Sequence, residues 1–243
     1  MYNIGNVKEI LGFEDTIYFE TIDSTNVLSG KMARAGKDNF LIIAKTQTGG
    51  KGRHNRKWYS PEGGIYFSFA LNSTKLPFSP QLFSIASSIG VMNFLNEQQV
   101  QNVEYRWPND ILVNGKKICG ILCELVDNIV IAGIGFNLNN EVFDEEIEKI
   151  ATSLYLEKKM THKEEYALLE IMLSILKTAS DKEKISQFLK DNPMKGKRIL
   201  VKTGEKSFSG IVMGFKETGE IEIETADGKM QFFAGDIEIL RGE

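Results

Sequence analysis

The chain has 243 residues, of which 42% are hydrophobic and 26% are charged, and its formal net charge at pH 7 is −4. These values are ordinary for a globular protein with a sizeable core, and the length suits one main domain with a small second one. The acidic balance argues against a dedicated nucleic-acid binder, which needs a basic face, and fits an enzyme that concentrates positive charge locally.

The cysteines and the lack of long apolar runs indicate in which cellular compartment the protein works. Cys119 and Cys123 lie four residues apart on one predicted strand, on the same side but too far apart for easy bridging. We expect free thiols in a reducing cytosol, and two cysteines with two histidines offer no metal-site spacing. The first eleven residues do not resemble a signal peptide, and no apolar run approaches the ~20 residues of a membrane span. We therefore predict a cytoplasmic protein without a membrane partner.

The first 140 residues alternate between apolar strands and helices. Asp23 to Asn26 is a cluster of helix N-cap formers, so a helix is predicted from Thr25 to Ala35, ending at Gly36. A buried helix is predicted over 83–95. Hydrophobic patterning predicts strands over 17–22, 40–44, 64–71, 103–107, 111–124 and 128–138.

Beyond residue 140 the pattern becomes helical and then changes to short strands. Helices are predicted over 141–151, from a capping box of Thr161 and Glu164 to about residue 178, and over 182–189. Asp191-Asn192-Pro193 then breaks the chain, so we expect two domains, 1–194 and 195–243. The second is predicted to be a small all-β barrel. Its strands are expected over 198–201, 209–212, 221–224, 230–233 and 237–240, with turns at Gly204, Gly219 and Asp227-Gly228.

A polar stretch between two predicted strands, residues 46–58, concentrates glycine and positive charge. Its glycines let the backbone wrap around a ligand, and guanidinium groups offer bidentate contacts to phosphate or carboxylate. Two phosphate-binding motifs are excluded: a Walker A loop would need Ser or Thr at Gly52, and the dinucleotide fingerprint would need glycine at Asn55. A solvated flexible loop and, against the overall acidity, a nucleic-acid contact remain as alternatives. Counted from Lys45, which immediately precedes the stretch, the basic residues are Lys45, Lys51, Arg53, Arg56 and Lys57.

The segment from Arg106 to Gly120 carries the most information. A polar corner ends one strand, and Asn114-Gly115 between two apolar runs is a strong hairpin signal, because both turn residues take positive φ. Lys117 then leads into an apolar strand, where it loses hydration and needs an anionic partner. Since no partner carboxylate is evident, a bound anionic substrate is a candidate.

Three further segments have both a structural and a functional interpretation. Ser24-Thr25-Asn26 can be a helix cap or can bind a polar ligand head beside the helix N-terminus. Trp107-Pro108-Asn109-Asp110 can be a rigid strand end with a structural tryptophan. Gly133-Ile134-Gly135-Phe136-Asn137 can be a bent strand with close backbone packing, or can present Asn137 to a nucleotide.

Taken together, these segments resemble the biotin protein ligases, also called biotin–acetyl-CoA-carboxylase ligases. Ser24-Thr25-Asn26, the loop from Gly50 to Trp58, the 107–110 corner, Lys117 and the 133–137 segment occur in that family's order and spacing. The resemblance implies an α+β fold. It consists of a mixed β-sheet with helices packed on one face, as in class II synthetases, and a small SH3-like β-barrel.

The resemblance also implies two half-reactions. Biotin and ATP, with Mg²⁺, give biotinyl-5′-AMP and pyrophosphate. A specific lysine of a biotin carboxyl carrier protein, from acetyl-CoA carboxylase or another biotin-dependent carboxylase, then attacks the mixed anhydride. Lys117 would bridge the biotin carboxylate and the α-phosphate as the principal catalytic residue, with Arg53 on the phosphate side. The loop from Gly49 to Lys57 would order over the intermediate and exclude water.

The family's binding residues carry over to matching positions in this sequence. Those implied for biotin are Ser24, Thr25, Asn26, Gln47, Gly50, Lys51, Arg53, Lys117 and Gly120. Those implied for the nucleotide are Arg53, Arg56, Trp58, Asn109 and Asn137, with Trp58 stacking on the adenine. Asp110 is implied as an indirect Mg²⁺ contact.

Three positions depart from the family's usual pattern. Lys51 stands for arginine, Asn55 for glycine and Arg106 for lysine, and lysine for arginine loses a planar bidentate contact. Some family members carry an N-terminal DNA-binding helix-turn-helix, for which a first strand at about residue 17 leaves no room, so we expect no DNA partner. Homodimerisation by sheet edges is implied by the resemblance.

Two other functions remain open from the sequence. A lipoate or octanoate ligase or transferase of the related superfamily shares the catalytic sheet and a lysine, but the C-terminal barrel and the Trp-Pro-Asn-Asp corner favour biotin. A biotin or nucleotide sensor would bind ligand without releasing pyrophosphate. The presence of both Lys117 and Arg53 argues against it.

Overall fold

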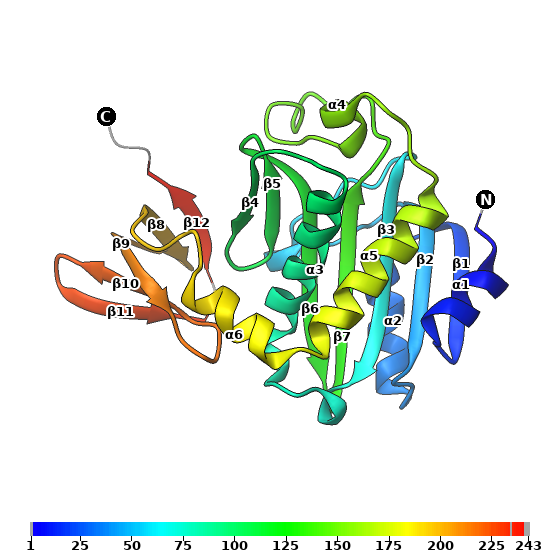
Figure 1. The fold of residues 1–243 in the computed structure, drawn as a ribbon, viewed down its shortest axis with the longest axis horizontal. Helices are drawn as coiled ribbons and strands as arrows, with labels where there is room; N and C mark the ends of the chain where they lie inside the picture. The colour runs from blue at the N-terminus through cyan, green and yellow to red at the C-terminus, as the bar shows by residue number, and fades with distance from the viewer. Residues whose placement is uncertain (1, 234, 241–243) are drawn as a thin grey trace.

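The computed structural model describes residues 2–233 and 235–240. A seven-stranded sheet, in the order β1-β2-β3-β7-β6-β5-β4, forms the larger part of the molecule (Figure 1). β1 and β2 run parallel and the other neighbouring pairs of this main sheet are antiparallel, so the sheet is mixed. Its strands are β1 (Asp15–Ile22), β2 (Phe40–Gln47), β3 (Gly64–Asn72), β4 (Val103–Arg106), β5 (Asp110–Val113), β6 (Lys116–Val126) and β7 (Ile129–Asn137).

Helices cover both faces of the main sheet. On one face α3 (Phe83–Glu97) and α5 (Glu164–Ala179) pack against each other over the main core, with α1 (Ile4–Leu11) beside them. α2 (Thr25–Arg34) lies on the other face, behind the sheet in Figure 1, over a smaller core. Every residue of the central strand β7 is buried, and a strand buried on both faces needs a layer on each side. The predicted fold class is confirmed. The helices were expected on one face of the sheet, and α2 differs because it covers the opposite face.

A second, five-stranded antiparallel sheet follows the helices, and we call it the C-terminal sheet. Its order is β11-β10-β9-β8-β12, and turn glycines Gly204, Gly219 and Gly228 have φ of 59°, 94° and 110°. Glycine suits these turns because it has no Cβ to clash at positive φ. The five predicted strands are therefore confirmed. Their bounds are β8 (Arg198–Thr203), β9 (Lys206–Phe215), β10 (Ile221–Thr225), β11 (Gly228–Phe232) and β12 (Asp236–Ile239).

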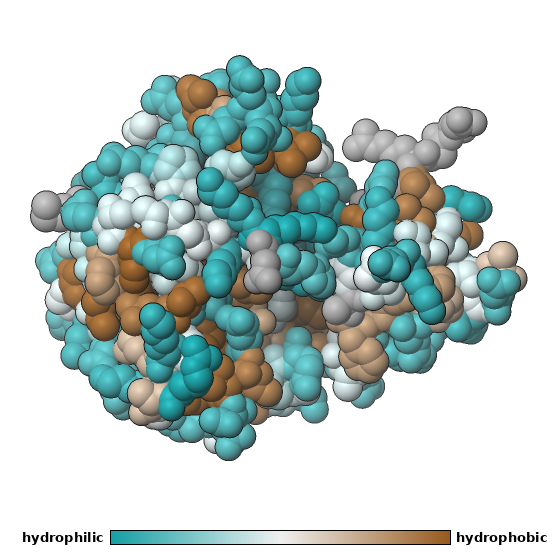
Figure 2. All heavy atoms as spheres, turned by 180° about the vertical axis from the view of Figure 1, so that it is seen from behind, coloured by the Kyte–Doolittle hydropathy of each residue, from teal (hydrophilic) through white to brown (hydrophobic). Residues whose placement is uncertain are grey.

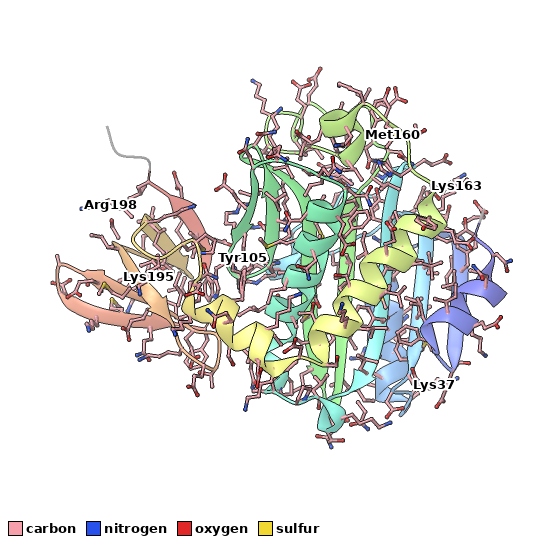
Figure 3. The ribbon with its side chains drawn as sticks, viewed as in Figure 1. Lys37, Tyr105, Met160, Lys163, Lys195 and Arg198 are labelled. Atoms are coloured by element: carbon pink, nitrogen blue, oxygen red, sulfur yellow. The ribbon has the colours of Figure 1, made fainter. Side chains whose placement is uncertain are left out.

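Two predictions of local structure are wrong. Residues 145–150 form turns and 141–144 have no regular secondary structure, so the predicted helix over 141–151 is absent. Its last residues pair instead with another segment: Lys117 N donates to Ile150 O (2.7 Å), and Thr152 N donates to Lys117 O (2.9 Å). The capping box of Thr161 is also absent. Lys163, labelled in Figure 3, is the N-cap of α5, and no side chain caps that helix.

The sequence pattern also missed two short helices. α1 begins after Asn3, whose side chain accepts from Asn6 N (3.2 Å), and it ends at Gly12 with φ of 72°. A cap and a left-handed glycine are the ordinary helix boundaries, so the signal was present in the sequence. α4 (Leu154–Lys158) is a single short helix capped by Ser153. In residues 2–233 and 235–240, no helix is both long and apolar enough to span a membrane.

The corner at Trp107 joins the main sheet to the C-terminal sheet. Trp107 is 2% exposed; its indole Nε1 donates to Gly219 O (3.1 Å) and its backbone N to Met194 Sδ (3.4 Å). The neighbouring Tyr105, labelled in Figure 3, packs edge-on against Phe188 of α6 (Lys182–Lys190), with ring centroids 5.4 Å apart. The structural interpretation of this tryptophan is therefore confirmed, because its ring and both donors hold two parts of the fold together.

Replacing Trp107 should loosen this junction. Trp107→Phe removes the indole donor and part of the buried ring, so we expect the free energy of unfolding to fall by about 1 to 3 kcal/mol. Urea denaturation followed by far-ultraviolet circular dichroism measures the change. Trp58→Phe is the matched control and should cost less, because Trp58 Nε1 has no hydrogen-bond partner among the described residues. Equal midpoints for Trp107→Phe and the parent would contradict this role.

Candidate active site

A cavity of about 310 Å³ opens on the sheet face that carries α2. Figure 2 views this side and shows a hollow between the main body and the C-terminal sheet, edged largely by hydrophilic residues. The cavity is lined by the start of α2, the loop after β2, the glycines of β6 and β7, and the corner between β4 and β5. Of the predicted site residues, all but Gly50 line it, so the structure brings the sequence motifs together.

Hydroxyl and amide groups form one end of the cavity. Thr25 N donates to Gln47 Oε1 (2.8 Å), Thr25 Oγ1 is 2.8 Å from Ser68 Oγ, and Gln47 Nε2 donates to Ser60 Oγ (2.9 Å). Ser24 is the N-cap of α2, so its structural interpretation is confirmed. These bonds fix the side chains in defined directions, and a polar ligand head entering here would meet ordered donors and acceptors.

The floor of the cavity is made by glycines. Gly120 of β6 pairs with Gly135 of β7, and the Trp58 ring lies against both. A Cβ on Gly135 would lie 2.2 Å from Trp58 Nε1, and one on Gly120 would lie 2.8 Å from Trp58 Cζ3. A Cβ on Gly133 would likewise lie 2.6 Å from Asn26 Nδ2. Glycine is required at these positions because the ring and the amide approach the backbone directly.

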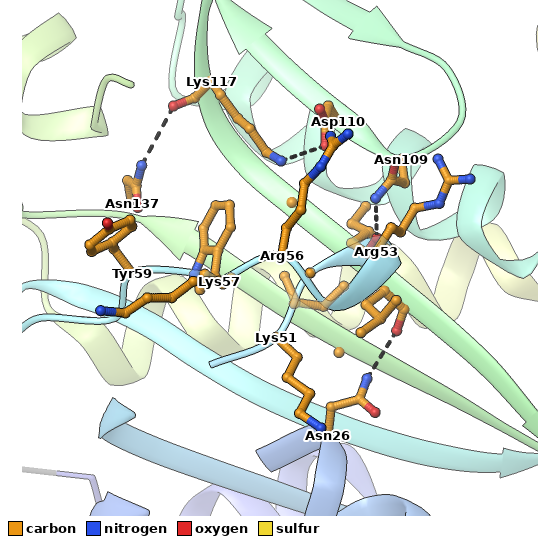
Figure 4. A pocket seen from close by; sticks show the side chains of 18 of the residues that line it. Asn26, Lys51, Arg53, Arg56, Lys57, Tyr59, Asn109, Asp110, Lys117 and Asn137 are labelled. Atoms are coloured by element: carbon orange, nitrogen blue, oxygen red, sulfur yellow. Dashed lines mark hydrogen bonds and ion pairs between the residues drawn. The ribbon is translucent and has the colours of Figure 1, made fainter. Parts of the chain in front are cut away.

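Lys117 has a partner carboxylate, which corrects the expectation that none exists. Its Nζ lies 2.7 Å from Asp110 Oδ1 and 5.0 Å from the centroid of the Trp58 ring. Figure 4 shows the pair of Lys117 and Asp110. The other carboxylate oxygen of Asp110 accepts from Arg106 Nη2 (2.7 Å), so one anion holds two cations. The hairpin brings them together: both turn residues have positive φ, as predicted, and β5 and β6 shift register after Ile111.

Two asparagines predicted to meet a nucleotide also brace the backbone. Asn109 Nδ2 donates to Ile121 O (2.6 Å). Asn137 Nδ2 donates to Thr152 O (2.9 Å) and, at 3.5 Å, to Lys117 O. Each side chain lines the cavity while its amide nitrogen donates to the backbone of another segment.

The glycine-rich loop reaches the C-terminal sheet. Arg53 Nη1 donates to Gly235 O (3.0 Å), and the Arg56 guanidinium forms a two-point ion pair with the Asp236 carboxylate. Burial lowers the pKa of Arg53 from its usual value, but an arginine remains charged near neutral pH. The end of the loop meets residues 141–151 through a hydrogen bond from the Tyr59 hydroxyl to Glu146.

Sequence reasoning missed one wall of the cavity. Phe143, Ile147 and Ile150, from the segment wrongly predicted as a helix, line it. Their signal was available as large apolar residues in an otherwise acidic stretch, but the segment was predicted only as a helix. Asp236 was also missed, because nothing near it in the sequence indicates a site.

The described residues do not fit a directly bound metal ion. Within 2–233 and 235–240, no group of three or more metal-ligating side chains occurs. Asp110, the implied Mg²⁺ contact, is already paired with Arg106 and Lys117. Mg²⁺ is commonly held by one or two carboxylates together with substrate phosphates and water, so this site alone offers little for direct ligation.

Comparisons with known proteins place the chain in a family. The sequence model of the biotin/lipoate A/B protein ligase family matches residues 18–139. The bifunctional ligase/repressor BirA of Bacillus subtilis is 30% identical over 255 aligned residues, covering 97% of this chain and 77% of that protein. The biotin–[acetyl-CoA-carboxylase] ligase of Mycobacterium tuberculosis is 32% identical over 138 residues, covering 54% of this chain and 51% of that protein. The chain therefore belongs to the biotin/lipoate A/B protein ligase family.

A solved structure extends the likeness to nearly the whole chain. The biotin protein ligase of Aquifex aeolicus, in complex with biotin and ATP, matches with a TM-score of 0.80 at 28% identity. The match covers 95% of this chain and 100% of that one, so it includes the C-terminal sheet as well as the main sheet. The resemblance stated from the sequence motifs is thus confirmed.

The glycine floor can be tested without a ligand. Gly135→Ala should push the Trp58 ring off the sheet, because its Cβ would lie 2.2 Å from Nε1. We expect the tryptophan emission to shift to longer wavelength as Trp58 becomes wetter, with Trp107 as a constant background since it is 2% exposed. Gly5→Ala in α1, where the nearest atom is 3.6 Å away, is the control. An unchanged spectrum for Gly135→Ala would show that the ring does not rest on this floor.

Proposed function

We propose that this protein activates biotin with ATP to biotinyl-5′-AMP and transfers the biotin to a specific lysine of a biotin carboxyl carrier protein. The observation that carries the proposal is the arrangement around one cavity: an ordered polar end, a lysine over a glycine floor, and two loop arginines at the rim. The Mycobacterium tuberculosis relative is named a biotin–[acetyl-CoA-carboxylase] ligase, and the Aquifex protein was solved with biotin and ATP, which supports the same substrates here.

The first half-reaction joins two anions, so it needs positive charge at the point where they meet. The biotin carboxylate attacks the α-phosphorus of ATP, an oxygen–phosphorus bond forms, and pyrophosphate leaves. Lys117 would move from Asp110 to the biotin carboxylate and the α-phosphate, while Arg53 screens the phosphate side. Thr25 and Gln47 would hold the ureido ring at the polar end, and the acyl chain would lie beside the Trp58 ring that covers Gly120.

The nucleotide would lie between the loop and the wall that sequence reasoning missed. We assign the adenine to the Trp58 ring and to the apolar side chains Phe143, Ile147 and Ile150. Asn109 and Asn137 line the same cavity, and their side-chain oxygens would meet the polar edge of the adenine. Arg56 would bind a phosphate. The closed loop would exclude water, because an acyl-adenylate hydrolyses readily.

The second half-reaction transfers the acyl group. The neutral ε-amine of the carrier lysine attacks the biotinyl carbonyl carbon, the carbon–oxygen bond to AMP breaks, and the amine loses a proton as the amide forms. AMP leaves with the bonding electrons. No covalent intermediate with this protein is required.

The proposal also includes the metal ion, the cellular location, the oligomeric state and the domain limits of the protein. Mg²⁺ would enter as the counter-ion of the ATP phosphates, with Asp110 in at most an indirect contact. The protein would act in the cytoplasm as a homodimer, without a DNA or membrane partner. The limits 1–194 for a catalytic domain and 195–243 for an SH3-like barrel also remain proposals, and residues 1 and 243 lie outside the described part of the chain.

Lys117 and the acid specificity can be tested together by ATP–pyrophosphate exchange with biotin, lipoate or octanoate. We expect exchange with biotin alone, and a loss of about 100-fold or more in Lys117→Ala, because the charge that screens two anions is removed. Lys116→Ala is the matched control, since the side chain of Lys116 points to Glu148 O (3.3 Å) and not into the cavity. Exchange with lipoate or octanoate would move the protein to the related ligases, and tight biotin binding without exchange would favour a sensor.

Arg53 can be tested by the fate of the intermediate. Arg53→Gly should still form the adenylate but release it, so we expect biotin on lysines of bystander proteins such as serum albumin, detected by streptavidin blot. His54→Gly is the matched control: His54 has φ of 53°, which glycine adopts easily, so it adds similar flexibility while keeping the guanidinium. If Arg53→Gly labels the carrier as selectively as the parent, its assignment is wrong.

A further inference from the structure

Two residues at the entry to β12, Gly235 and Asp236, make the contacts that hold the glycine-rich loop. Gly235 O accepts from Arg53 Nη1 (3.0 Å), and Asp236 accepts from both terminal nitrogens of Arg56, one of them at 3.2 Å. Asp236 also lines the cavity, although it lies 180 residues after Arg56 in the sequence. Figure 1 places β12 on the side of the C-terminal sheet that is nearest the main sheet.

We infer that Asp236 is a positioning residue, which holds the Arg56 guanidinium in the orientation that receives the nucleotide phosphates. This inference rests on the proposed function of Arg56. It assigns the C-terminal sheet a direct part in binding the nucleotide, through a carboxylate that touches the loop arginine and not the substrate.

The geometry of the ion pair leaves Arg56 able to bind a second anion. A guanidinium has five N–H groups, and Asp236 takes one from each terminal nitrogen. The Arg56 side chain is 65% exposed, so its remaining N–H groups are accessible. An exposed ion pair adds little to stability by itself, but a two-point contact fixes the plane of the guanidinium.

Asp236 also offsets the repulsion within the loop. Arg53 and Arg56 are close enough that Arg56 contributes to lowering the pKa of Arg53, after burial as the larger cause, while Asp236 acts in the opposite direction. Two cations can therefore be held side by side before an anion arrives. Groups fixed in advance reduce the ordering cost of binding, so the benefit should appear in affinity for the nucleotide.

The test is the KM for ATP in ATP–pyrophosphate exchange with biotin. For Asp236→Asn we expect a rise of roughly five-fold in the KM for ATP, with kcat and the KM for biotin changed by less than about two-fold. Asp236→Glu should restore much of the affinity, because it keeps the charge. The control is Glu238→Gln on the same strand, where the carboxylate pairs with exposed Lys202 (3.2 Å), and its KM should equal the parent's.

A double-variant cycle separates this inference from the function on which it rests. If Asp236 acts through Arg56, then Arg56→Ala and Arg56→Ala/Asp236→Asn should have the same KM for ATP. An unchanged KM in Arg56→Ala would overturn the phosphate role of Arg56 itself. A raised KM in Arg56→Ala, with an unchanged or lowered KM in Asp236→Asn, would overturn the positioning role alone. Additive effects in the double variant would do the same.

Discussion

The cavity depends on a patch of the main sheet that carries no side chains. Gly120 and Gly135 face each other on β6 and β7, and the Trp58 ring rests on them with Lys117 Nζ 5.0 Å above its centroid. A Cβ at either glycine would displace the ring, because it would lie only 2.2 Å (Gly135) or 2.8 Å (Gly120) from the nearest atom of the Trp58 ring. Gly120 and Gly135 therefore determine how closely the Trp58 ring approaches the sheet, and with it the position of the ring beneath the Lys117 amine.

Positive charge at this cavity is held in place by acceptors of the protein. Asp110 pairs with Arg106 and Lys117, while Gly235, just before β12, and Asp236, its first residue, hold the two loop arginines. A chain with a net charge of −4 can therefore present several cations to an anionic substrate at one place. In the proposed reaction Lys117 changes partner while the arginines are already in place, and such preorganisation limits the reorientation needed when charge develops.

Local signals predicted much of the fold. The Asn114-Gly115 turn was predicted because both residues need positive φ, and they adopt φ of 51° and 78°. For the segment 141–151, local signals predicted a helix that the structure does not contain. Its backbone bonds to Lys117 and its apolar side chains face the cavity, so its partners lie elsewhere in the chain. α2 lies opposite the other helices for a related reason, because the face a helix covers depends on the packing of the whole sheet.

The sequence by itself determined which residues form the site: the glycines, the basic loop and Lys117 occur in an order and spacing that identified the family, and all of these motifs line one cavity. Only the tertiary structure decided what these residues contact. The partners of Arg53 and Arg56 lie 182 and 180 residues away, and the pairing of Lys117 with Asp110 depends on a register shift in the hairpin. Propensities and patterns describe neighbours along the chain, whereas these contacts arise where two separate sheets pack together.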